Sequence, residues 1–498
     1  MTSMMRTPLR RFAWLISYLN LSLVLSLSLS LVLVLVCQGL NSQIFAADKF
    51  LVGVSQVDIT PPVGFRKAGS YRQKISTGVL DPLYAKAIVF RQGDMSAALV
   101  VSDLLSVPPD LSRLAREKAS QGTGIPVSNI VVAATHNHGS PEYWGSLRDL
   151  YHIPAVQQHG TDPQETIDYQ AKLVDAWAKA IVQASKKAKH AELDLLMAQQ
   201  SGLAFNRRFH MNDGSVRFNP GRGNPQIIRP AGPVDKSLPV LFFRQPDQGR
   251  QIFGALTTFA LHTAVRSGTM FSGDYPAVLQ VSLREQYGND FVSIFAEGAA
   301  GDINHIDVRD ADPLKNDEQV DHIGKSLAAT IVGAESKASQ IDHPDLAVRS
   351  NTIHVPFQPI DDAGYRNAMQ TLRDQTSQRI PFLTLVSAWR DCHRFHHTQA
   401  YGDAKPIEVQ AIRLDEETAI VTLPHELFVE IGLAIKSDSP FRNTIVISLA
   451  NDVDYYIPTK RAFAEGSYEV TTCPLDPGCG EQFVEAALDT LRQVKDAP

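Results

Sequence analysis

The chain has 498 residues, of which 44% are hydrophobic and 20% charged, and its formal net charge is -6. This composition is typical of a globular protein with ample apolar side chains for a core, and it excludes disordered, collagen-like and disulfide-framework chains. No dense block of lysine or arginine occurs, so we expect no nucleic-acid partner.

Residues 1–47 have the character of an export segment. Arg6, Arg10 and Arg11 precede an uncharged Leu/Val/Ser stretch from Ala13 to Val36. That stretch is long for the apolar core of a signal peptide and just long enough to span a bilayer. We therefore expect a signal peptide or an N-terminal anchor over residues 1–47, one folded domain over residues 48–498, and a periplasmic, cell-surface or secreted location.

The cysteines suggest one cross-link. Cys473 and Cys479 enclose a turn-rich Pro-Leu-Asp-Pro-Gly loop. A disulfide can close such a loop in an oxidising exported compartment, and we expect one here. Cys392 is expected to be a free, buried thiol.

Short apolar runs that end abruptly in polar groups recur along the chain. These runs are 97–101, 130–134, 253–261, 291–295, 419–423 and 444–450. They are rich in β-branched residues and short enough for buried strands. The segments between them carry helical patterns, so we predict an α/β fold in which helices cover one or more mixed sheets.

The predicted helices show ordinary start signals and apolar stripes. Asp162, Pro163 and Glu165 supply an N-cap, a first-turn proline and a capping-box acid. The stripe Ile167, Val174, Trp177 and Ile181 follows. Further helices are predicted from Asp274 to about Gly288, along Val320, Ile323, Leu327 and Ile331, and along Phe483, Ala487, Leu488 and Leu491.

Two stretches lack clear periodicity. Residues 202–233 hold five glycines, four prolines and five arginines, and we expect a long loop or hairpin excursion with a functional role. Residues from about 389 to 406 are expected to be irregular as well. Their His393, His396 and His397 are interpreted as surface residues, with a second metal site as the alternative.

Metal-capable groups follow several of the predicted strands. His136 and His138 are two residues apart, so a continuing strand would point both imidazoles the same way. His262 and Glu426 follow two other strands, whereas Tyr455 and Tyr456 fit a structural role. Two histidines and one carboxylate form the ligand set of a catalytic zinc, whose bound water has a pKa of about 7 and can attack an amide or ester.

Other catalytic motifs are missing from the sequence. There is no G-x-S-x-G elbow, no H-E-x-x-H helix, no Walker loop and no G-x-G-x-x-G. Serine-triad and nucleotide chemistry are therefore not supported.

Six short segments occur in an order that resembles one known family. Residues 53–60 form an opening strand, 134–141 carry Ala-Thr-His-Asn-His-Gly-Ser-Pro, and 259–262 carry Phe-Ala-Leu-His. Ser-Gly-Asp follows at 272–274, Leu-Pro-His-Glu at 423–426, and a further similar segment at 451–459. Together they resemble the catalytic domain of the neutral/alkaline non-lysosomal ceramidases, which hydrolyse the amide bond of N-acylsphingosines. The likeness covers most of residues 50–495.

The resemblance implies specific roles. The zinc ligands would be His136, His262, Glu426 and Tyr456. His138 would be the acid or base near the scissile amide, and Asn206 and Arg207 would contact substrate. It also implies a lipid N-acyl substrate, a part in sphingolipid metabolism, and contact with a membrane surface through the substrate or the N-terminal segment.

The chain departs from the family pattern in two ways. Asn304 stands where the family has a serine, and an amide can donate a hydrogen bond to an oxyanion but cannot be a nucleophile. Nothing strand-rich follows Tyr456, so we expect a short member without the family's C-terminal β-sandwich domain. We therefore predict an N-acyl amidohydrolase in which zinc-bound water attacks the carbonyl, Asn304 and Arg207 polarise or position the substrate, and ceramide itself is in doubt.

Two alternatives remain open. One keeps the metal but changes the bond to an ester or an acyl group on a sugar or other polar substrate. Five arginines would suit such an anionic or polyhydroxylated substrate: Arg207, Arg208, Arg217, Arg222 and Arg229. The other is a non-catalytic surface binding protein, because a fold does not fix a function.

Overall fold

Three mixed sheets form the framework of the residues that the computed structural model describes, which are 49–375, 377–452 and 455–497. Residues from Phe50 to Pro498 form one compact unit. The leader expected over residues 1–47 lies outside the described residues. Among the described helices, none is both long and apolar enough to cross a membrane.

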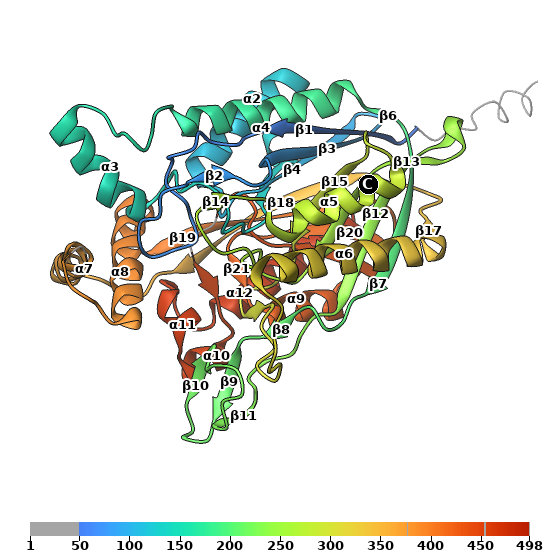
Figure 1. Ribbon diagram of the computed structural model, residues 1–498. Coiled ribbons are helices and arrows are strands. Elements are labelled where there is room, and N and C mark those ends of the chain that lie inside the picture. Colours follow the sequence, from blue (N-terminus) through green and yellow to red (C-terminus); the bar gives the residue numbers. More distant parts are fainter. Residues whose placement is uncertain (1–48, 376, 453–454, 498) are drawn as a thin grey trace, which may run out of the picture. The chain divides into compact units, whose positions relative to one another are not determined.

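The first sheet has the order β5-β4-β3-β1-β6. Its strands are β1 (Leu51–Asp58), β3 (Tyr84–Gln92), β4 (Met95–Ser102), β5 (Ile130–Ala134) and β6 (Lys189–His190). Strands β4 and β5 are parallel and the other pairs antiparallel. Helices α2 (Pro109–Thr123) and α4 (Tyr169–Lys186) cover its outer face, where Trp177 and Ile181 are fully buried (Figure 1).

The second sheet has the order β15-β13-β12-β7-β17. Its strands are β7 (Glu192–Gln199), β12 (Ser237–Gln245), β13 (Gln251–Phe259), β15 (Val292–Glu297) and β17 (Ser339–Gln340), and β13 and β15 are parallel. Helices α5 (Asp274–Tyr287) and α6 (Asn316–Ala334) pack on it through one apolar cluster, which includes Val320, Ile323, Leu327 and Ile331. The stripe read from the sequence is therefore the buried face of α6.

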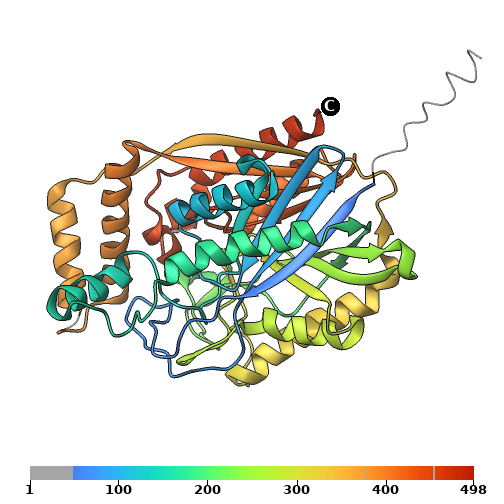
Figure 2. The ribbon, with the colours of Figure 1, turned by 90° about the horizontal axis from the view of Figure 1, so that it is seen from above.

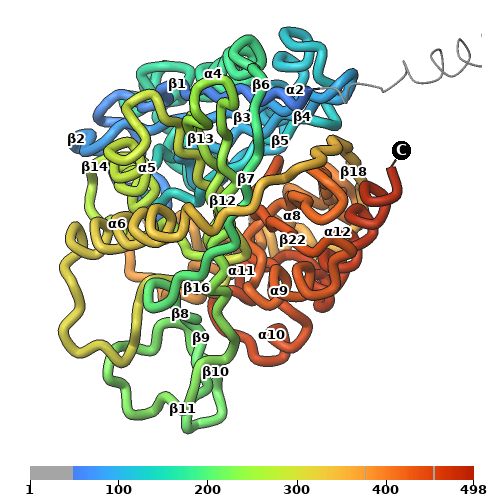
Figure 3. Tube along the Cα trace, turned by 90° about the vertical axis from the view of Figure 1, so that its right-hand side faces the viewer, coloured from blue at the N-terminus to red at the C-terminus, as the bar shows by residue number. Residues whose placement is uncertain are grey.

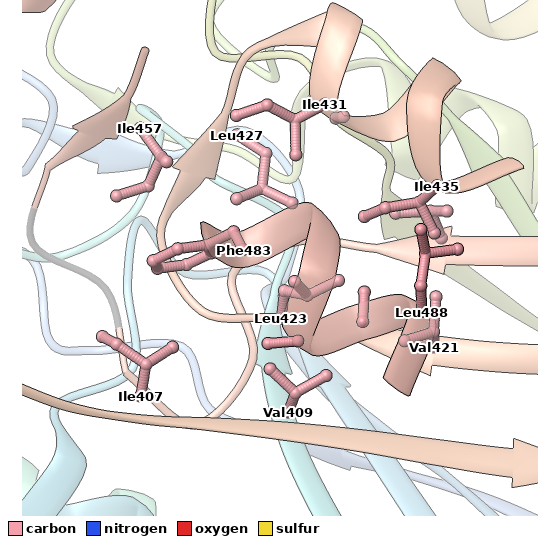
Figure 4. Close-up of a cluster of buried hydrophobic side chains, with 14 of the residues drawn as sticks. Ile407, Val409, Val421, Leu423, Leu427, Ile431, Ile435, Ile457, Phe483 and Leu488 are labelled. Atoms are coloured by element: carbon pink, nitrogen blue, oxygen red, sulfur yellow. The ribbon is translucent and has the colours of Figure 1, made fainter. Parts of the chain in front are cut away.

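The third sheet has the order β18-β19-β20-β22. Its strands are β18 (Ala347–Pro356), β19 (Ala404–Arg413), β20 (Thr418–Thr422) and β22 (Asn443–Ile447), and β20 and β22 are parallel. Helices α9 (Val429–Asp438) and α12 (Cys479–Lys495) cover it, and Phe483 and Leu488 of α12 meet Val409 and Val421 of the strands (Figure 4).

A shared core lies between the sheets. Phe90 and Leu99 of the first sheet, Phe243 of the second, and Ile412 and Ile420 of the third belong to one buried cluster. The three successive parts of the chain that carry these sheets lie against one another (Figure 3). Each sheet is thus apolar on both faces, one toward helices and one toward its neighbours, which explains the nearly continuous apolar runs. The predicted α/β architecture of mixed sheets covered by helices is confirmed.

Smaller elements complete the fold. The excursion over residues 202–233 is a three-stranded hairpin sheet in the order β10-β9-β11, preceded by β8. These strands are β8 (Phe205–Asn206), β9 (Arg208–Met211), β10 (Val216–Phe218) and β11 (Ile227–Pro230). Two-stranded pairs join β2 (Gly78–Val79) to β14 (Met270–Phe271), β8 to β16 (Ile303–Asn304), and β21 (Glu426–Leu427) to β23 (Tyr456–Ile457). The remaining helices are α3 (Ser146–His159), α7 (Asp362–Asp374), α8 (Phe382–Tyr401), α10 (Lys460–Glu465) and α11 (Tyr468–Thr472).

Most of the irregular stretch predicted around residues 389–406 is helical. Helix α8 runs through His393, His396 and His397 and packs against α7. Leu385, Ala388, Trp389 and Cys392 recur at helical spacing and are buried in that contact. His397 is buried as well, so the interpretation of all three histidines as surface residues was wrong. Helices α3, α7 and α8 lie together at one end of the fold (Figures 1 and 2).

The predicted start of helix α4 was also wrong. The helix is capped by Asp168, whose side chain accepts a hydrogen bond from the Ala171 amide. Asp162 lies six residues before this cap, and its carboxylate pairs with Arg66, a residue distant in sequence, so it does not cap the helix.

The expected Cys473–Cys479 disulfide is not formed. Both residues are buried free thiols, as is Cys392. The Cys473 thiol is hydrogen-bonded to that of Cys479, and this contact together with burial raises the pKa of Cys479. The turn between them is closed by a backbone hydrogen bond from Cys479 to Asp476 (3.1 Å) and needs no covalent link.

Candidate metal centre

The His136–His138 segment is a turn rather than the continuation of a strand. Strand β5 ends at Ala134, and His136 adopts a left-handed backbone conformation with φ of 56°. The two imidazoles nevertheless converge, with 3.2 Å between their Nε2 atoms. The two rings therefore lie together as expected, but a turn and not a continuing strand brings them there.

Two other segments bring groups to the same place. His262 follows the end of β13, and its Nε2 lies 3.2 Å from the nearer oxygen of Glu426. The same oxygen, Oε2, lies 3.0 Å from Nε2 of His136. The Tyr456 hydroxyl lies 3.4 Å from Nε2 of His262. Side chains from residues 136, 262, 426 and 456 thus form one buried cluster, which we call the imidazole–carboxylate centre.

The oxygen donors of this centre are carried by one short parallel ladder. Glu426 pairs with Tyr456 and Leu427 pairs with Ile457 in the β21–β23 register. Because neighbouring residues of a strand point to opposite sides, the Leu427 and Ile457 side chains lie on the side opposite to Glu426 and Tyr456. Figure 4 shows Leu427 and Ile457 within an apolar cluster, where both are fully buried. The Tyr456 ring borders the same apolar cluster, and its hydroxyl reaches the imidazoles.

Backbone carbonyls fix the orientation of all three imidazoles. The Nδ1 atoms lie 3.2 Å from the Leu105 carbonyl for His136, 3.1 Å from that of Gly69 for His138, and 2.9 Å from that of Ala300 for His262. A carbonyl only accepts hydrogen bonds, so each Nδ1 carries the proton and each Nε2 presents a lone pair to the centre. Metal-binding histidines in proteins are held in this way.

The electrostatics of the centre leave one negative charge without a proton donor. Burial and the nearby Arg207 lower the pKa of His262 to about 3, and burial lowers that of His138 well below its ordinary value. Burial opposes ionisation of Glu426, whereas a positive charge at His136 lowers its pKa well below the ordinary range; with neutral imidazoles a bound cation would supply that charge instead. Oε2 of Glu426 is buried and has no hydrogen-bond donor among the described residues. Imidazole lone pairs around an unsatisfied carboxylate fit a divalent cation, and nitrogen and oxygen donors suit zinc.

Arg207 lies directly behind this centre. Its guanidinium donates to Glu469 (2.9 Å) and to the Gly301 carbonyl (2.7 Å), and a third nitrogen lies 3.2 Å from Nε2 of His262. It also lies 5.1 Å from the ring centroid of Tyr456. The Arg207 charge is thus buried but fully partnered.

The other residues predicted to contact substrate lie further away. Asn206 donates to Asp302 at 2.7 Å, and Asn304 donates to Asn219 at 2.9 Å. Asn206 also donates to the Pro233 carbonyl, so the described contacts of both side chains link β8 and β16 to the hairpin excursion, and the structure does not bring them into the imidazole–carboxylate centre.

A cavity of about 220 Å³ opens onto the centre. Its floor includes His136, His138 and Glu426, and its walls include Tyr71 and Tyr468, whose hydroxyls lie 2.8 Å apart. One face of α8 forms a further wall. Sequence reasoning missed Tyr71, Tyr468 and α8, because none of them follows a predicted strand end.

Glu297 is a further acid beside the centre. It ends β15, is buried, and lies 3.9 Å from Nδ1 of His262. Burial and the neighbouring Glu426 raise its pKa well above the ordinary value. The sequence pattern placed Glu297 at a strand end but gave it no role.

A second histidine and acid group occurs near α3, and we call it the Arg66 cluster. His152, Asp162 and Glu165 lie close enough to share an ion. Arg66 donates to Asp162 (2.5 Å) and Glu165 (3.1 Å), and Arg148 donates to Glu165 (2.7 Å). All four carboxylate oxygens therefore have cationic donors, and the group is an ion-pair network rather than a metal site.

Comparisons with known proteins also point to a ceramidase-like hydrolase. The model of the neutral/alkaline non-lysosomal ceramidase family, N-terminal region, matches residues 50–320. The solved neutral ceramidase from Pseudomonas aeruginosa is similar with a TM-score of 0.67 and 15% identity, over 90% of this chain and 75% of that one. A structure described as ceramidase complexed with C2 gives a TM-score of 0.66 and 15% identity, over 89% and 75%. At this identity the structural likeness shows the fold alone. No curated protein matches.

Proposed function

The chain belongs to the neutral/alkaline non-lysosomal ceramidase family, and from this premise we propose that it is a zinc-dependent hydrolase that cleaves the amide bond of an N-acyl compound. A ceramidase-like hydrolase is what the family match supports. The finer parts of the proposal are the metal, the bond and the roles of individual residues. We also propose that residues 48–498 are the catalytic domain of an exported protein and that residues 1–47 are its signal peptide or anchor.

Four residues would hold the zinc: His136, His262, Glu426 and Tyr456. The observation that carries this assignment is the Glu426 oxygen, which is buried between two imidazole lone pairs without a proton donor. When bound, zinc supplies a Lewis acid that lowers the pKa of water and polarises a carbonyl. Tyr456 is the least evident member, because burial raises its pKa well above the ordinary value and it must lose its proton to ligate as an anion.

The remaining residues would handle protons and orientation. His138 lies next to His136 with its Nε2 free of a proton, so it can accept a proton at that atom and later donate it to the leaving amine. Arg207 stays charged because Tyr456 and Glu469 outweigh the effect of burial, and from behind the centre it would position His262 and Tyr456. Asn304 would act through its bond to Asn219, which steadies the strand pair beside Arg207.

One experiment tests the metal and the chemistry together. We expect purified protein to contain about one zinc per chain and His136→Ala to lose both zinc and amidase activity. His138→Ala should keep its zinc and lose about a hundredfold or more in kcat. Metal content is read by elemental analysis, and hydrolysis by release of fatty acid from an N-acyl amide. Full activity after complete removal of zinc would contradict the mechanism.

The arginine-based case for an anionic substrate is weakened by the structure. Arg208 pairs with Glu465 and Glu469, and Arg217 pairs with Asp213. Arg222 donates to the Asp307 carbonyl. These arginines hold the hairpin excursion together and link it to Glu465, Glu469 and Asp307, so they give no specific support for an anionic substrate.

A further inference from the structure

Helix α8 presents one side to the cavity. Val386, Trp389, Arg390 and His393 line it at positions i, i+3, i+4 and i+7, which is the spacing of a single helix face. The family model matches residues 50–320, so this wall lies outside the matched segment. The wall is therefore a place where this chain can set its own specificity.

Trp389 carries an unused hydrogen-bond donor on that wall. Its side chain is 4% exposed, and its Nε1 has no acceptor among the described residues. Buried donors are rarely left without an acceptor, because the lost hydrogen bond to water is costly. A tryptophan that served packing alone would normally find an acceptor for this group, as Trp177 does with the Ser102 hydroxyl at 2.6 Å.

Two further lining residues, Glu142 and Trp144, offer a second polar group and an aromatic surface. Glu142 and Trp144 line the cavity from the segment that precedes α3. Burial raises the pKa of Glu142 to about 8, so its carboxyl is mostly neutral at pH 7 and can both donate and accept hydrogen bonds. Trp144 is half-buried, which leaves part of its ring surface open to a ligand.

The charge of these walls favours a neutral ligand over an anionic one. Arg390 is the nearest candidate for binding an anion, but its Nε and Nη2 lie 2.9 and 2.8 Å from Asp391. Arg394 shares the same carboxylate at 3.2 Å. Asp391 thus occupies Nε and Nη2 of Arg390, the one arginine among the residues that line this cavity, so that guanidinium cannot offer its usual two-pronged contact to a phosphate or sulfate group.

We propose that the walls formed by Trp389, Glu142 and Trp144 are a subsite for a neutral, hydroxyl-rich head group, such as a hexose, carried by the amine part of the substrate. Trp389 Nε1 donates to a hydroxyl oxygen, Glu142 bonds a second hydroxyl, and the apolar face of the sugar packs on Trp144. This inference rests on the proposed function and deepens it, because it names the class of N-acyl amine that is cleaved.

A matched pair of lipids tests the proposal on the zinc-loaded full chain. The pair is N-octanoyl-sphingosine and N-octanoyl-glucosylsphingosine, which share the scissile bond and differ by one hexose. We expect the glucosylated lipid to have at least a tenfold higher kcat/KM, mainly through a lower KM, since the sugar adds hydrogen bonds and stacking. Equal or reversed preference would overturn the subsite.

The variant Trp389→Phe removes the N–H and keeps most of the ring. It should lower kcat/KM for the glucosylated lipid about fivefold to tenfold and leave that for the plain lipid unchanged. Glu142→Ala should have the same selective effect, and Thr384→Ala, at an exposed α8 residue outside the cavity lining, is the control. An equal loss for both lipids would indicate a structural role for Trp389 and contradict the proposal.

Binding separates the subsite from the chemistry. Calorimetry with glucosylsphingosine and sphingosine needs no hydrolysis, so it reports on the subsite even if neither amide is cleaved. Selective binding of the glucosylated amine that is weakened in Trp389→Phe supports the subsite, and with no cleavage it would count against the proposed function alone. Equal binding of the two amines would overturn the subsite whatever the activity.

Discussion

The imidazole–carboxylate centre and the Arg66 cluster contain similar residues and serve different purposes. Each brings histidine and acid side chains close enough to share an ion. In the Arg66 cluster every carboxylate oxygen accepts from a guanidinium group, whereas Oε2 of Glu426 is buried beside two imidazoles that cannot donate to it. What distinguishes a candidate metal centre is therefore an unmet charge, not the number of potential ligands.

The second difference lies in the histidines themselves. Nδ1 of His152 faces the Asp162 carboxylate at 2.9 Å, so its proton is used within the cluster. The Nδ1 protons of His136, His138 and His262 are used on backbone carbonyls outside the centre, so none of the three Nε2 atoms carries a proton. A histidine can thus serve as a metal ligand or as an ion-pair partner, depending on what its Nδ1 atom contacts.

The largest expected effect comes from removing the unmet charge. Glu426→Gln keeps the size of the side chain and replaces a carboxylate by an amide, so we expect loss of zinc and a fall in kcat/KM of at least about a hundredfold. Elemental analysis and the amidase assay measure both. His152→Ala is the matched control in the Arg66 cluster and should leave zinc content and activity unchanged. If both variants lost zinc equally, the distinction between the two clusters would fail.

A stability measurement tests whether the Arg66 cluster has a structural role. Arg66 is 2% exposed, and Arg66→Met leaves Asp162 and Glu165 with fewer cationic partners. Breaking a buried pair in this way should cost about 3–5 kcal/mol of unfolding free energy, with zinc content retained in the folded protein. Arg113→Met removes an exposed pair with Glu117 and should cost at most about 1 kcal/mol. Urea unfolding of the two variants would show whether Arg66 has this structural role.

A smaller effect concerns pH. The pKa of His262 is about 3 in the folded chain, below its ordinary value of 6.5, mainly because of burial. The fold therefore favours neutral His262, and this contribution is complete above pH 6.5 and lost as the pH falls toward 3. We expect the unfolding free energy of the zinc-free protein to fall on acidification by at most about 1.4 kcal/mol per pH unit from this group. His262→Gln should flatten that dependence in urea titrations at several pH values. An unchanged slope would mean that His262 is not held neutral.

The sequence predicted the parts of the molecule that local pattern determines. The buried strands and the helices α5, α6 and α12 were evident from apolar runs and stripes, and His136, His262 and Glu426 followed from the ends of such runs. Tyr456 came only from the family resemblance, because its meaning depends on pairing with Glu426 across thirty residues. No local pattern records that pairing.

Long-range contacts explain what the sequence did not predict. Asp162 has the residue type of an N-cap, but Arg66 takes its carboxylate, and Asp168 caps the helix instead. Helix α8 mixes histidines and arginines with its apolar residues because it faces both α7 and the cavity. Its sequence therefore lacks the single apolar stripe that would have predicted a helix. In both cases the deciding partner lies far away in the chain.

The β21–β23 ladder has a consequence for how this protein can change. Glu426 and Tyr456 sit on one rung of a ladder only two residues long, with Leu427 and Ile457 anchoring it below. The intervening chain can lengthen or shorten between α9 and β22 without moving either oxygen, as long as that rung is kept. A slip of one residue in either strand would instead turn its oxygen away from the imidazoles. Tolerance to insertion and sensitivity to register are thus set by the same four residues.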